Sequence, residues 1–400
     1  MCWKAASANS ARAGPWVAES FAPWTAPGAI ARPALQAGCG GPTGVAPIIQ
    51  LHPTRLCNLA CAHCYTSSGP RETQQLPLPL LRAVLDDAAA LGYRQLAVSG
   101  GEPLLYEALP GLLQHARRLG MLTSLTSNGL LLSPQRWAAI APHLDRLAIS
   151  VDGREPTHDA LRGQAGALAR TLRLLAQPRA TGTPFGFIFT LTQHNVDELE
   201  DVVGLAAAHG AQGVQVHPLT LHGRARETLA GARPDGQELL AAIVEAQRLA
   251  QALQTRSGVR VQVDALSQDQ ILAHRERLVP AWPAPGLTAL APVLVLQSDG
   301  QLLPLTHELP RALWLGSVHE APLKALAARW LHSSASRRLV QALERTWQAL
   351  AEGAQPAAYW YDEVAARVRP AEVHVPVPPL PSRGLMPRGP ALAQGRAAQA

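Results

Sequence analysis

The sequence predicts an α/β fold, a partial (β/α)6 barrel of parallel strands that carries a small C-terminal α+β appendage. Two observations predict the barrel. Short apolar runs rich in β-forming residues alternate with helical stretches about six times, a pattern typical of parallel strands joined by crossover helices. Polar residues collect where the apolar runs end, as expected of a barrel whose functional loops follow its strands. Six such units are too few for the standard barrel of about eight.

Six apolar runs are the expected strands. They cover residues 46–52, 94–99, 121–127, 145–150, 185–191 and 213–219. Between the first two, apolar side chains recur at helical spacing over residues 80–91 and follow prolines that a first helical turn tolerates. Ser133 before Pro134 predicts the cap and first residue of another helix, and Asn195 is expected to cap the helix that follows the fifth strand.

The pattern changes after an expected helix at residues 237–254. Two further β-rich runs follow, GVRVQVDA from residue 258 and VLVLQSDGQLLPLT from residue 293. In the second run, Asp299-Gly300 between two apolar stretches predicts a hairpin turn. Residues 258–318 therefore predict a small antiparallel appendage, followed by helices from about residue 320 to 369.

Four regions are expected along the chain. Residues 1–45 and 370–400 are rich in Ala, Gly and Pro without a sustained period, so they predict disordered tails. Residues 46–256 predict the barrel, and residues 257–369 predict the appendage with its helices.

Composition excludes several classes of protein. Of the 400 residues, 47% are apolar and 16% are charged, so most of the chain is expected to fold. A net charge of +6 without a block of like charges argues against nucleic acid as a partner. No apolar run approaches the roughly 18 residues of a membrane span, and the five cysteines do not suggest a disulfide framework. We expect a cytoplasmic protein with no membrane partner.

The chemistry is concentrated in the segment Cys57-Asn-Leu-Ala-Cys61-Ala-His-Cys64, just after the first expected strand. Three thiolates at this spacing fit round one centre, and soft sulfur ligands select zinc, copper(I) or an iron–sulfur cluster. A structural zinc ion needs four protein ligands, for which His63 and His52 are the nearest further candidates. A cubane held by three cysteines instead leaves one iron open to a substrate. The spacing favours the iron–sulfur site, with zinc and plain buried thiols as the alternatives.

A second motif, Ser99-Gly100-Gly101-Glu102-Pro103, ends the second expected strand. The three-cysteine loop after strand one, followed by GGEP after strand two, resembles the radical S-adenosylmethionine (SAM) superfamily over residues 46–220. The resemblance implies that Cys57, Cys61 and Cys64 ligate three irons of one [4Fe-4S] cluster. It also implies that the fourth iron binds the amino and carboxylate groups of SAM.

The GGEP motif is implied to contact the methionine end of SAM. Gly100 and Gly101 lack side chains, which would let the backbone approach the methionine amino group, and Glu102 would add an anion near that cation. A simple strand-to-helix turn is the alternative for this motif.

Polar residues after strands three and four are further candidates. Ser150 and Asp152 are implied to lie near the ribose and carboxylate of SAM, with Asn128 as a second candidate; ordinary Asn-Gly and Asp-Gly turns are the alternative. Arg162 lies in a segment that resembles the peptide-modifying branch, where an arginine meets the SAM carboxylate, and a solvated helix arginine is the alternative. Thr192, Gln193, Asn195 and His217 line the same rim and are candidates to contact adenine or substrate, although a helix cap is favoured for Asn195 and a hydrogen-bonded barrel histidine for His217.

The appendage departs from the family pattern. It resembles a SPASM/twitch-like domain, in which a hairpin and further cysteines hold auxiliary clusters, but no cysteine follows Cys64. Thr306 and His307 stand where such a ligand is expected. We therefore expect a degenerate domain that closes the barrel, shapes the substrate cavity and holds no thiolate-ligated cluster.

The resemblance implies a radical SAM enzyme. A one-electron donor such as flavodoxin or ferredoxin reduces the cluster, SAM is cleaved, and the 5′-deoxyadenosyl radical takes a hydrogen atom from a substrate. A peptide being matured is the first choice of substrate, and a small molecule or cofactor precursor is the second. The 45 residues before the first strand are too few for a fused peptide-recognition domain, so a leader peptide would need a separate recognition protein. A non-catalytic zinc-binding scaffold is the rival from another class.

Overall fold

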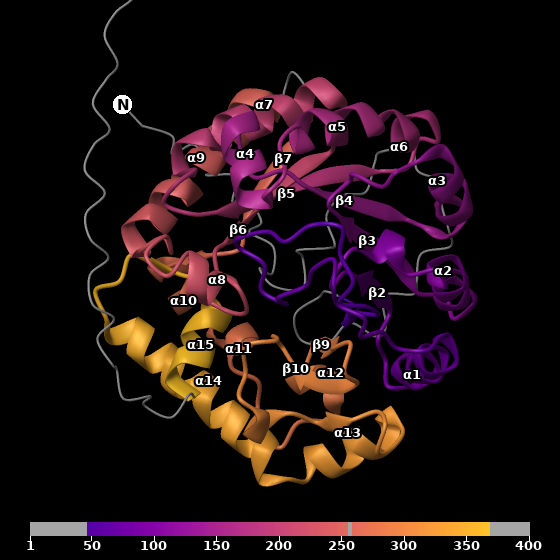
Figure 1. Ribbon diagram of the computed structural model, residues 1–400. Helices are drawn as coiled ribbons and strands as arrows, with labels where there is room; N and C mark the ends of the chain where they lie inside the picture. Colours follow the sequence, from indigo (N-terminus) through magenta and orange to yellow (C-terminus); the bar gives the residue numbers. More distant parts are fainter. Residues whose placement is uncertain (1–45, 255–257, 369–400) are drawn as a thin grey trace, which may run out of the picture.

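The computed structural model describes residues 46–254 and 258–368, and its frame is one ten-stranded sheet (Figure 1). The strands follow the order β11-β10-β9-β1-β2-β3-β4-β5-β6-β7. The tails predicted at residues 1–45 and 370–400 lie outside the described residues. The predicted α/β fold class is confirmed.

The six predicted barrel strands are all present, and each pairs in parallel with the next. They are β1 (Ile48–Leu51), β2 (Gln95–Val98), β3 (Leu122–Ser127), β4 (Arg146–Ser150), β5 (Phe185–Leu191) and β6 (Gly213–Pro218). β2 is buried along its whole length. Such continuous burial is typical of parallel strands, because both faces of the sheet are covered.

Helices cover the outer face of the curved sheet (Figure 1). In chain order they are α1 (Leu78–Ala90), α2 (Leu109–Arg118), α3 (Pro134–Ile140), α4 (Glu155–Arg162), α5 (Ala167–Leu174), α6 (Ala176–Ala180), α7 (Leu199–His209) and α9 (Gly236–Gln254). The short helix α8 (Ala225–Thr228) lies instead against the loop that follows β1, where Thr228 donates to the Ala62 carbonyl. Short 3-10 turns are η2 (Pro103–Leu105), η3 (Ala141–His143) and η4 (Val196–Glu198). Within the described ranges, no helix has both the length and the apolar character that a bilayer crossing requires.

The two predicted helix caps have different outcomes. Ser133 caps α3, since its hydroxyl accepts a hydrogen bond from the Arg136 amide at 3.3 Å. Asn195 occupies the predicted N-cap position, before η4, but its side chain makes no capping hydrogen bond. Its Oδ1 accepts from the Thr192 amide at 2.7 Å, and its Nδ2 donates to the Asp152 carbonyl at 3.0 Å. The Asn195 side chain therefore ties the segment after β4 to the segment after β5.

The C-terminal strands do not form the antiparallel appendage that the sequence predicts. β7 (Arg260–Val263) pairs in parallel with β6, and β9 (Val293–Leu296) pairs in parallel with β1. The predicted hairpin is present, because β10 (Gln301–Pro304) returns antiparallel to β9 after Asp299 and Gly300. β11 (Gly316–Ser317) pairs antiparallel with β10. Residues beyond 258 therefore extend the barrel sheet at both of its ends.

The remaining elements pack beside these strands. They are the pair β8 (Leu266–Ser267) and β12 (Ala357–Ala358), and the helices α10 (Gln268–Ala273), α11 (Arg275–Leu278), α12 (Leu287–Leu290), α13 (Leu323–Leu331), α14 (Ser334–Glu352) and α15 (Trp360–Val368), with the 3-10 turn η5 (Arg311–Leu313). One apolar core contains both Ile49 of β1 and Val364 of α15. The buried Tyr93 hydroxyl also donates to the Ala291 carbonyl at 2.7 Å. The sheet and core thus continue past residue 256, and the domain boundary predicted there stays a prediction.

Truncation tests how far the barrel depends on these residues. A chain that ends at residue 256 loses both β7 and β9, so the apolar strands β1 and β6 become sheet edges. We expect this chain to be insoluble or to unfold without a cooperative transition. A matched chain that ends at residue 368 keeps every described element and should unfold as the full chain does. A soluble monomer ending at residue 256, with a cooperative transition by circular dichroism, would contradict this dependence.

Candidate active site

A cavity of about 260 Å³ opens at the carboxyl ends of the parallel strands. Nine of the ten predicted site residues line it, namely Cys57, Cys61, Cys64, Gly100, Gly101, Glu102, Asn128, Ser150 and Arg162. Asp152 is the tenth, and it is fully buried and absent from the lining. The strand ends therefore bring together residues that lie more than a hundred positions apart in the sequence, as parallel barrels do.

The cysteine loop follows β1 without forming helix or strand. Cys57 and Cys61 are buried, and Cys64 is partly exposed. Burial raises the pKa of Cys57 to about 12, and burial also raises the pKa of Cys61 although the nearby Arg162 opposes this. The Leu59 amide donates to Cys57 Sγ at 3.5 Å, and Arg162 Nη1 donates to Cys61 Sγ at 3.7 Å. Both buried sulfurs therefore face hydrogen-bond donors, an environment suited to bound thiolates.

The two histidines proposed as a fourth zinc ligand make polar contacts through Nε2, and His63 Nδ1 is buried without a hydrogen-bond partner. His52 Nε2 lies 3.1 Å from Gln50 Nε2 and 3.4 Å from the Tyr65 hydroxyl. His63 Nε2 lies 3.7 Å from Asp152 Oδ2. Over residues 46–254 and 258–368, no group of three or more Cys, His, Asp or Glu side chains is arranged to hold a single metal ion. Cys57, Cys61 and Cys64 supply three thiols, the number that a cluster with one open iron uses and one fewer than the four protein ligands of a structural zinc site.

Gly100 and Gly101 lie against the start of the cysteine loop. A Cβ on Gly101 would lie 2.2 Å from the Leu56 carbonyl oxygen, and a Cβ on Gly100 would lie 2.9 Å from the His52 Cβ. The Gly101 amide donates to the Thr54 carbonyl at 2.9 Å. The close approach expected toward SAM is thus, in the structure, an approach to the chain's own backbone just before Cys57. The missing side chains let strand two and the cysteine loop touch.

Glu102 is fully buried, and its carboxylate is held by three donors. Oε1 accepts from the Leu104 amide at 3.1 Å and from the Ser127 hydroxyl at 2.9 Å, and Oε2 accepts from the Asn128 amide at 2.9 Å. Burial raises the pKa of Glu102 although these donors oppose it. The carboxylate expected beside the SAM amino group therefore joins the end of β2 to the end of β3.

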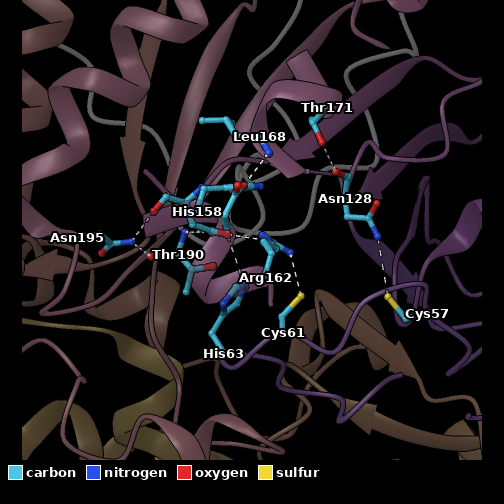
Figure 2. A network of polar contacts seen from close by, with 12 residues as sticks. Cys57, Cys61, His63, Asn128, His158, Arg162, Leu168, Thr171, Thr190 and Asn195 are labelled. Carbon is cyan, nitrogen blue, oxygen red and sulfur yellow. Dashed lines mark hydrogen bonds and ion pairs between the residues drawn. The ribbon is translucent and has the colours of Figure 1, made fainter. Parts of the chain in front are cut away.

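Asn128 and Ser150 follow β3 and end β4, and both contribute to the cavity lining. Asn128 points toward the cysteine loop (Figure 2): its Nδ2 donates to Asn58 Oδ1 at 2.9 Å and lies 4.0 Å from Cys57 Sγ. Its Oδ1 accepts from the Leu130 amide at 3.0 Å. The side chain thus closes the turn, as the alternative interpretation expects, and also contacts a cysteine.

Asp152 and Arg162 form a buried ion pair beneath the cavity wall. Arg162 Nε donates to Asp152 Oδ2 at 2.6 Å, and Thr190 donates its amide to Asp152 Oδ1 at 3.1 Å. Burial alone would raise the pKa of Asp152, but Arg162, His63 and His158 hold it well below its ordinary value. Asp152 therefore orients Arg162 and does not reach the cavity, whereas Arg162 reaches both the cavity and Cys61 (Figure 2).

The predicted rim residues divide into two groups. Thr192 and Asn195 are fully buried and bond to each other, and Gln193 donates to Glu238 at the surface. His217 lines the cavity, where its Nδ1 lies 3.1 Å from Asp264 Oδ2. Of the predicted rim, His217 alone thus belongs to the cavity lining that the structure describes.

The C-terminal region supplies a cavity wall that sequence reasoning largely missed. Thr306 and His307, noted in the sequence, line the cavity, and the His307 ring lies 4.3 Å from the Tyr65 ring between centroids. Asp264 and Tyr359 line it as well. The polar Asp264 directly after β7 was a usable signal, because a residue after a parallel strand reaches the functional edge of the sheet. Tyr359 carried no comparable local signal.

Comparisons with known proteins agree with this architecture. Residues 51–206 match the family model of the radical SAM superfamily. A PqqA peptide cyclase of Ruegeria pomeroyi is 30% identical over 266 residues, which cover 66% of this chain and 68% of that protein. An Fe-coproporphyrin III synthase of Methanosarcina barkeri is 31% identical over 180 residues, 44% of this chain and 45% of that protein. Streptococcus suis SuiB bound to S-adenosylmethionine superposes with a TM-score of 0.58 at 14% identity, covering 74% of this chain and 68% of SuiB.

Substituting Asp152→Asn should destabilise the metal-free protein by about 3–5 kcal/mol, because the buried Arg162 loses its counter-charge. The pKa of Asp152 is lowered in the fold, so its stabilisation is present above its unfolded pKa and is lost as pH falls through the folded pKa. The deficit measured by urea unfolding should therefore be constant from about pH 5 to about pH 8. Asp197→Asn, at an exposed carboxylate, should cost less than about 1 kcal/mol. Equal losses in the two variants would contradict the burial argument.

Substituting Gly101→Ala should displace the cysteine loop, because the new Cβ would overlap the Leu56 carbonyl. We expect the variant to lose most of its iron after anaerobic reconstitution, together with SAM binding. Gly204→Ala, on α7 with nothing within 4 Å of its new Cβ, is the matched control and should reconstitute normally. Iron content and the visible spectrum measure the outcome. Full iron content with SAM binding alone abolished would favour the original interpretation, in which the glycine makes room for SAM.

Proposed function

The chain belongs to the radical SAM superfamily, whose members use a [4Fe-4S] cluster and S-adenosylmethionine, and from that premise we propose that it modifies a peptide. The observation that carries the proposal is the shared cavity. The cysteine loop and the C-terminal residues His307 and Tyr359 line the same cavity, so a substrate bound there would be within reach of the cluster.

Cys57, Cys61 and Cys64 would hold three irons of the cluster. When bound, the cluster and SAM supply the radical that abstracts hydrogen from a substrate. The chain's part is to orient SAM against the substrate and to exclude water from the cavity. Asn128 and Arg162 lie beside the sulfurs of Cys57 and Cys61, where their N–H groups would stabilise bound thiolates.

Ser150 and Arg162 are the side chains we propose for SAM binding. Both line the cavity, Arg162 also contacts Cys61, and a guanidinium suits the SAM carboxylate. Glu102 and Asp152 would act indirectly, Glu102 by fixing Asn128 and Asp152 by fixing Arg162. Gly100 and Gly101 would act by seating the loop that carries the ligands.

The cavity wall favours a peptide over a tetrapyrrole, the class that the name of the M. barkeri relative indicates for that protein. A tetrapyrrole with several carboxylates needs several cationic partners. Within the described lining, Arg162 is the sole arginine or lysine, and Asp152 already pairs with it. Tyr65, Tyr359 and Tyr361 instead offer aromatic surface with hydroxyl groups, which suits peptide side chains. The R. pomeroyi relative is by name a peptide cyclase.

Two partner proteins complete the proposal. A flavodoxin or ferredoxin would deliver the electron, and a separate protein would recognise a leader peptide. We place the chain in the reducing cytoplasm, because its proposed ligands are free thiols. A small-molecule substrate is the second candidate, favoured by the modest cavity of about 260 Å³.

Anaerobic reconstitution tests the cluster. The wild type should bind about four iron and four sulfide per chain, as one cubane requires, and should cleave SAM under reduction. Changing Cys57, Cys61 and Cys64 together to Ala should abolish iron, sulfide and SAM cleavage. The double change of Cys2 and Cys39 to Ala is the matched control and should alter none of them. A brown, active triple variant would refute the ligand assignment, and about eight iron would reveal a second cluster.

Co-expression tests the substrate class. A short peptide encoded beside this chain should change in mass when both are produced together, and the triple cysteine variant should leave it unmodified. A small molecule that stimulates SAM cleavage while every neighbouring peptide stays unmodified would favour the second candidate.

A further inference from the structure

The cysteine loop is held from outside by a segment that neither motif includes. Residues 222–228 follow β6 and contain α8. Between Cys57 and Cys64 the chain has no helix or strand, and its one internal backbone hydrogen bond in the structure runs from the Cys64 amide to the Cys61 carbonyl at 3.3 Å. A loop with so little internal structure depends on its neighbours for its shape.

Arg224 contacts two points of this loop and one point just beyond it. Its Nη1 donates to the Cys61 carbonyl at 2.8 Å and its Nη2 donates to the Ser68 carbonyl at 2.7 Å. Its own amide donates to the Cys64 carbonyl at 2.9 Å. The planar guanidinium thus bridges two carbonyls on opposite sides of Cys64, a geometry that lysine cannot reproduce.

Two residues near Arg224, Gly223 and Thr228, also hold the cysteine loop. Gly223 has φ +56°, and a Cβ there would lie 2.3 Å from the Tyr65 carbonyl oxygen, so glycine alone allows this approach. Thr228 donates its hydroxyl to the Ala62 carbonyl at 2.6 Å. Backbone carbonyls of Cys61, Ala62 and Cys64 are therefore all bound by one short segment. Because carbonyls and not sulfurs are bound, the thiols stay available to ligate.

We propose that Arg224 is a positioning residue, which holds the cysteine loop in the shape that presents Cys61 and Cys64 together to the cluster. The inference deepens the proposed function and rests on it for the identity of the bound group. It assigns Arg224 no contact with SAM or substrate. The loop geometry it describes exists in the metal-free protein and can be measured there.

The first measurement uses metal-free protein under anaerobic conditions. Cys57 and Cys61 are buried, so a thiol reagent should modify them slowly, and peptide-resolved mass spectrometry separates them from Cys2 and Cys39. Arg224→Gln removes both guanidinium contacts and should accelerate alkylation of Cys61 by about tenfold, the change expected from losing one or two hydrogen bonds. Arg224→Lys, which keeps the charge without the fork, should give an intermediate rate. Arg136→Gln, an exposed arginine on α3, is the matched control and should alkylate as the wild type does.

The second measurement follows cluster loss from reconstituted protein to an iron chelator. Arg224→Gln should lose iron severalfold faster than Arg136→Gln, while the unfolding midpoints of the two metal-free variants agree. Equal alkylation and equal chelation rates in the two variants would overturn the inference. So would a fall in the Arg224→Gln midpoint large enough to expose every cysteine equally, because the residue would then stabilise the whole fold. A wild type that takes up no cluster, with Cys61 still selectively released by Arg224→Gln, would refute the proposed function and leave the positioning role standing.

Discussion

The site depends on one backbone contact, the seating of the cysteine loop's entry on Gly100 and Gly101. The Gly101 and Glu102 amides donate to the Thr54 and Leu56 carbonyls, both at 2.9 Å. These two bonds depart from the regular β1–β2 ladder, in which the Ser99 amide donates to the Leu51 carbonyl, and they hold the chain that leads directly into Cys57. Any side chain at Gly101 would break them. The GGEP motif therefore positions the cysteine loop, in addition to any contact that it makes with SAM.

Two buried carboxyl groups, those of Glu102 and Asp152, position further side chains around the cysteine loop. Glu102 accepts from groups on β3 and on the turn that follows, which fixes Asn128 beside Cys57. Asp152 fixes Arg162 beside Cys61 in the same way. In each case a fully buried carboxyl group holds a donor near a sulfur. Burying a charge is costly unless it is paired and hydrogen-bonded. Asp152 meets that condition through Arg162, whereas Glu102 is held by three uncharged donors and burial raises its pKa. Both side chains are committed to these contacts, so neither is free to move toward a ligand.

Sequence reasoning succeeded where the signal is local. The six strands follow from short apolar runs, and the Asp299-Gly300 turn follows from the residues it needs. It failed where a tertiary contact decides. Nothing in VLVLQ indicates pairing with β1 in place of a separate sheet, because a buried strand looks alike beside either partner. Asn195 is a residue type common at helix N-caps, yet in the fold its side-chain amide bridges two loops. Glu102 was placed correctly on the strand end, but its partners 25 and 26 residues later cannot be read from the motif.

The difference between local signals and tertiary contacts also explains why the sequence did not reveal the C-terminal wall of the cavity. A cysteine-held auxiliary cluster needs thiols, and the sequence has none after Cys64. The β9–β10 hairpin nevertheless arrives beside β1, since its strand completes the sheet there, and this brings His307 against Tyr65, the residue directly after the third cysteine. His222, in the segment that carries Arg224, packs on the other side of the contact, with its ring centroid 5.4 Å from that of His307. The hairpin and the segment after β6 therefore meet at the cysteine loop. A region without thiols can still govern the site, because its contacts support the loop that carries them.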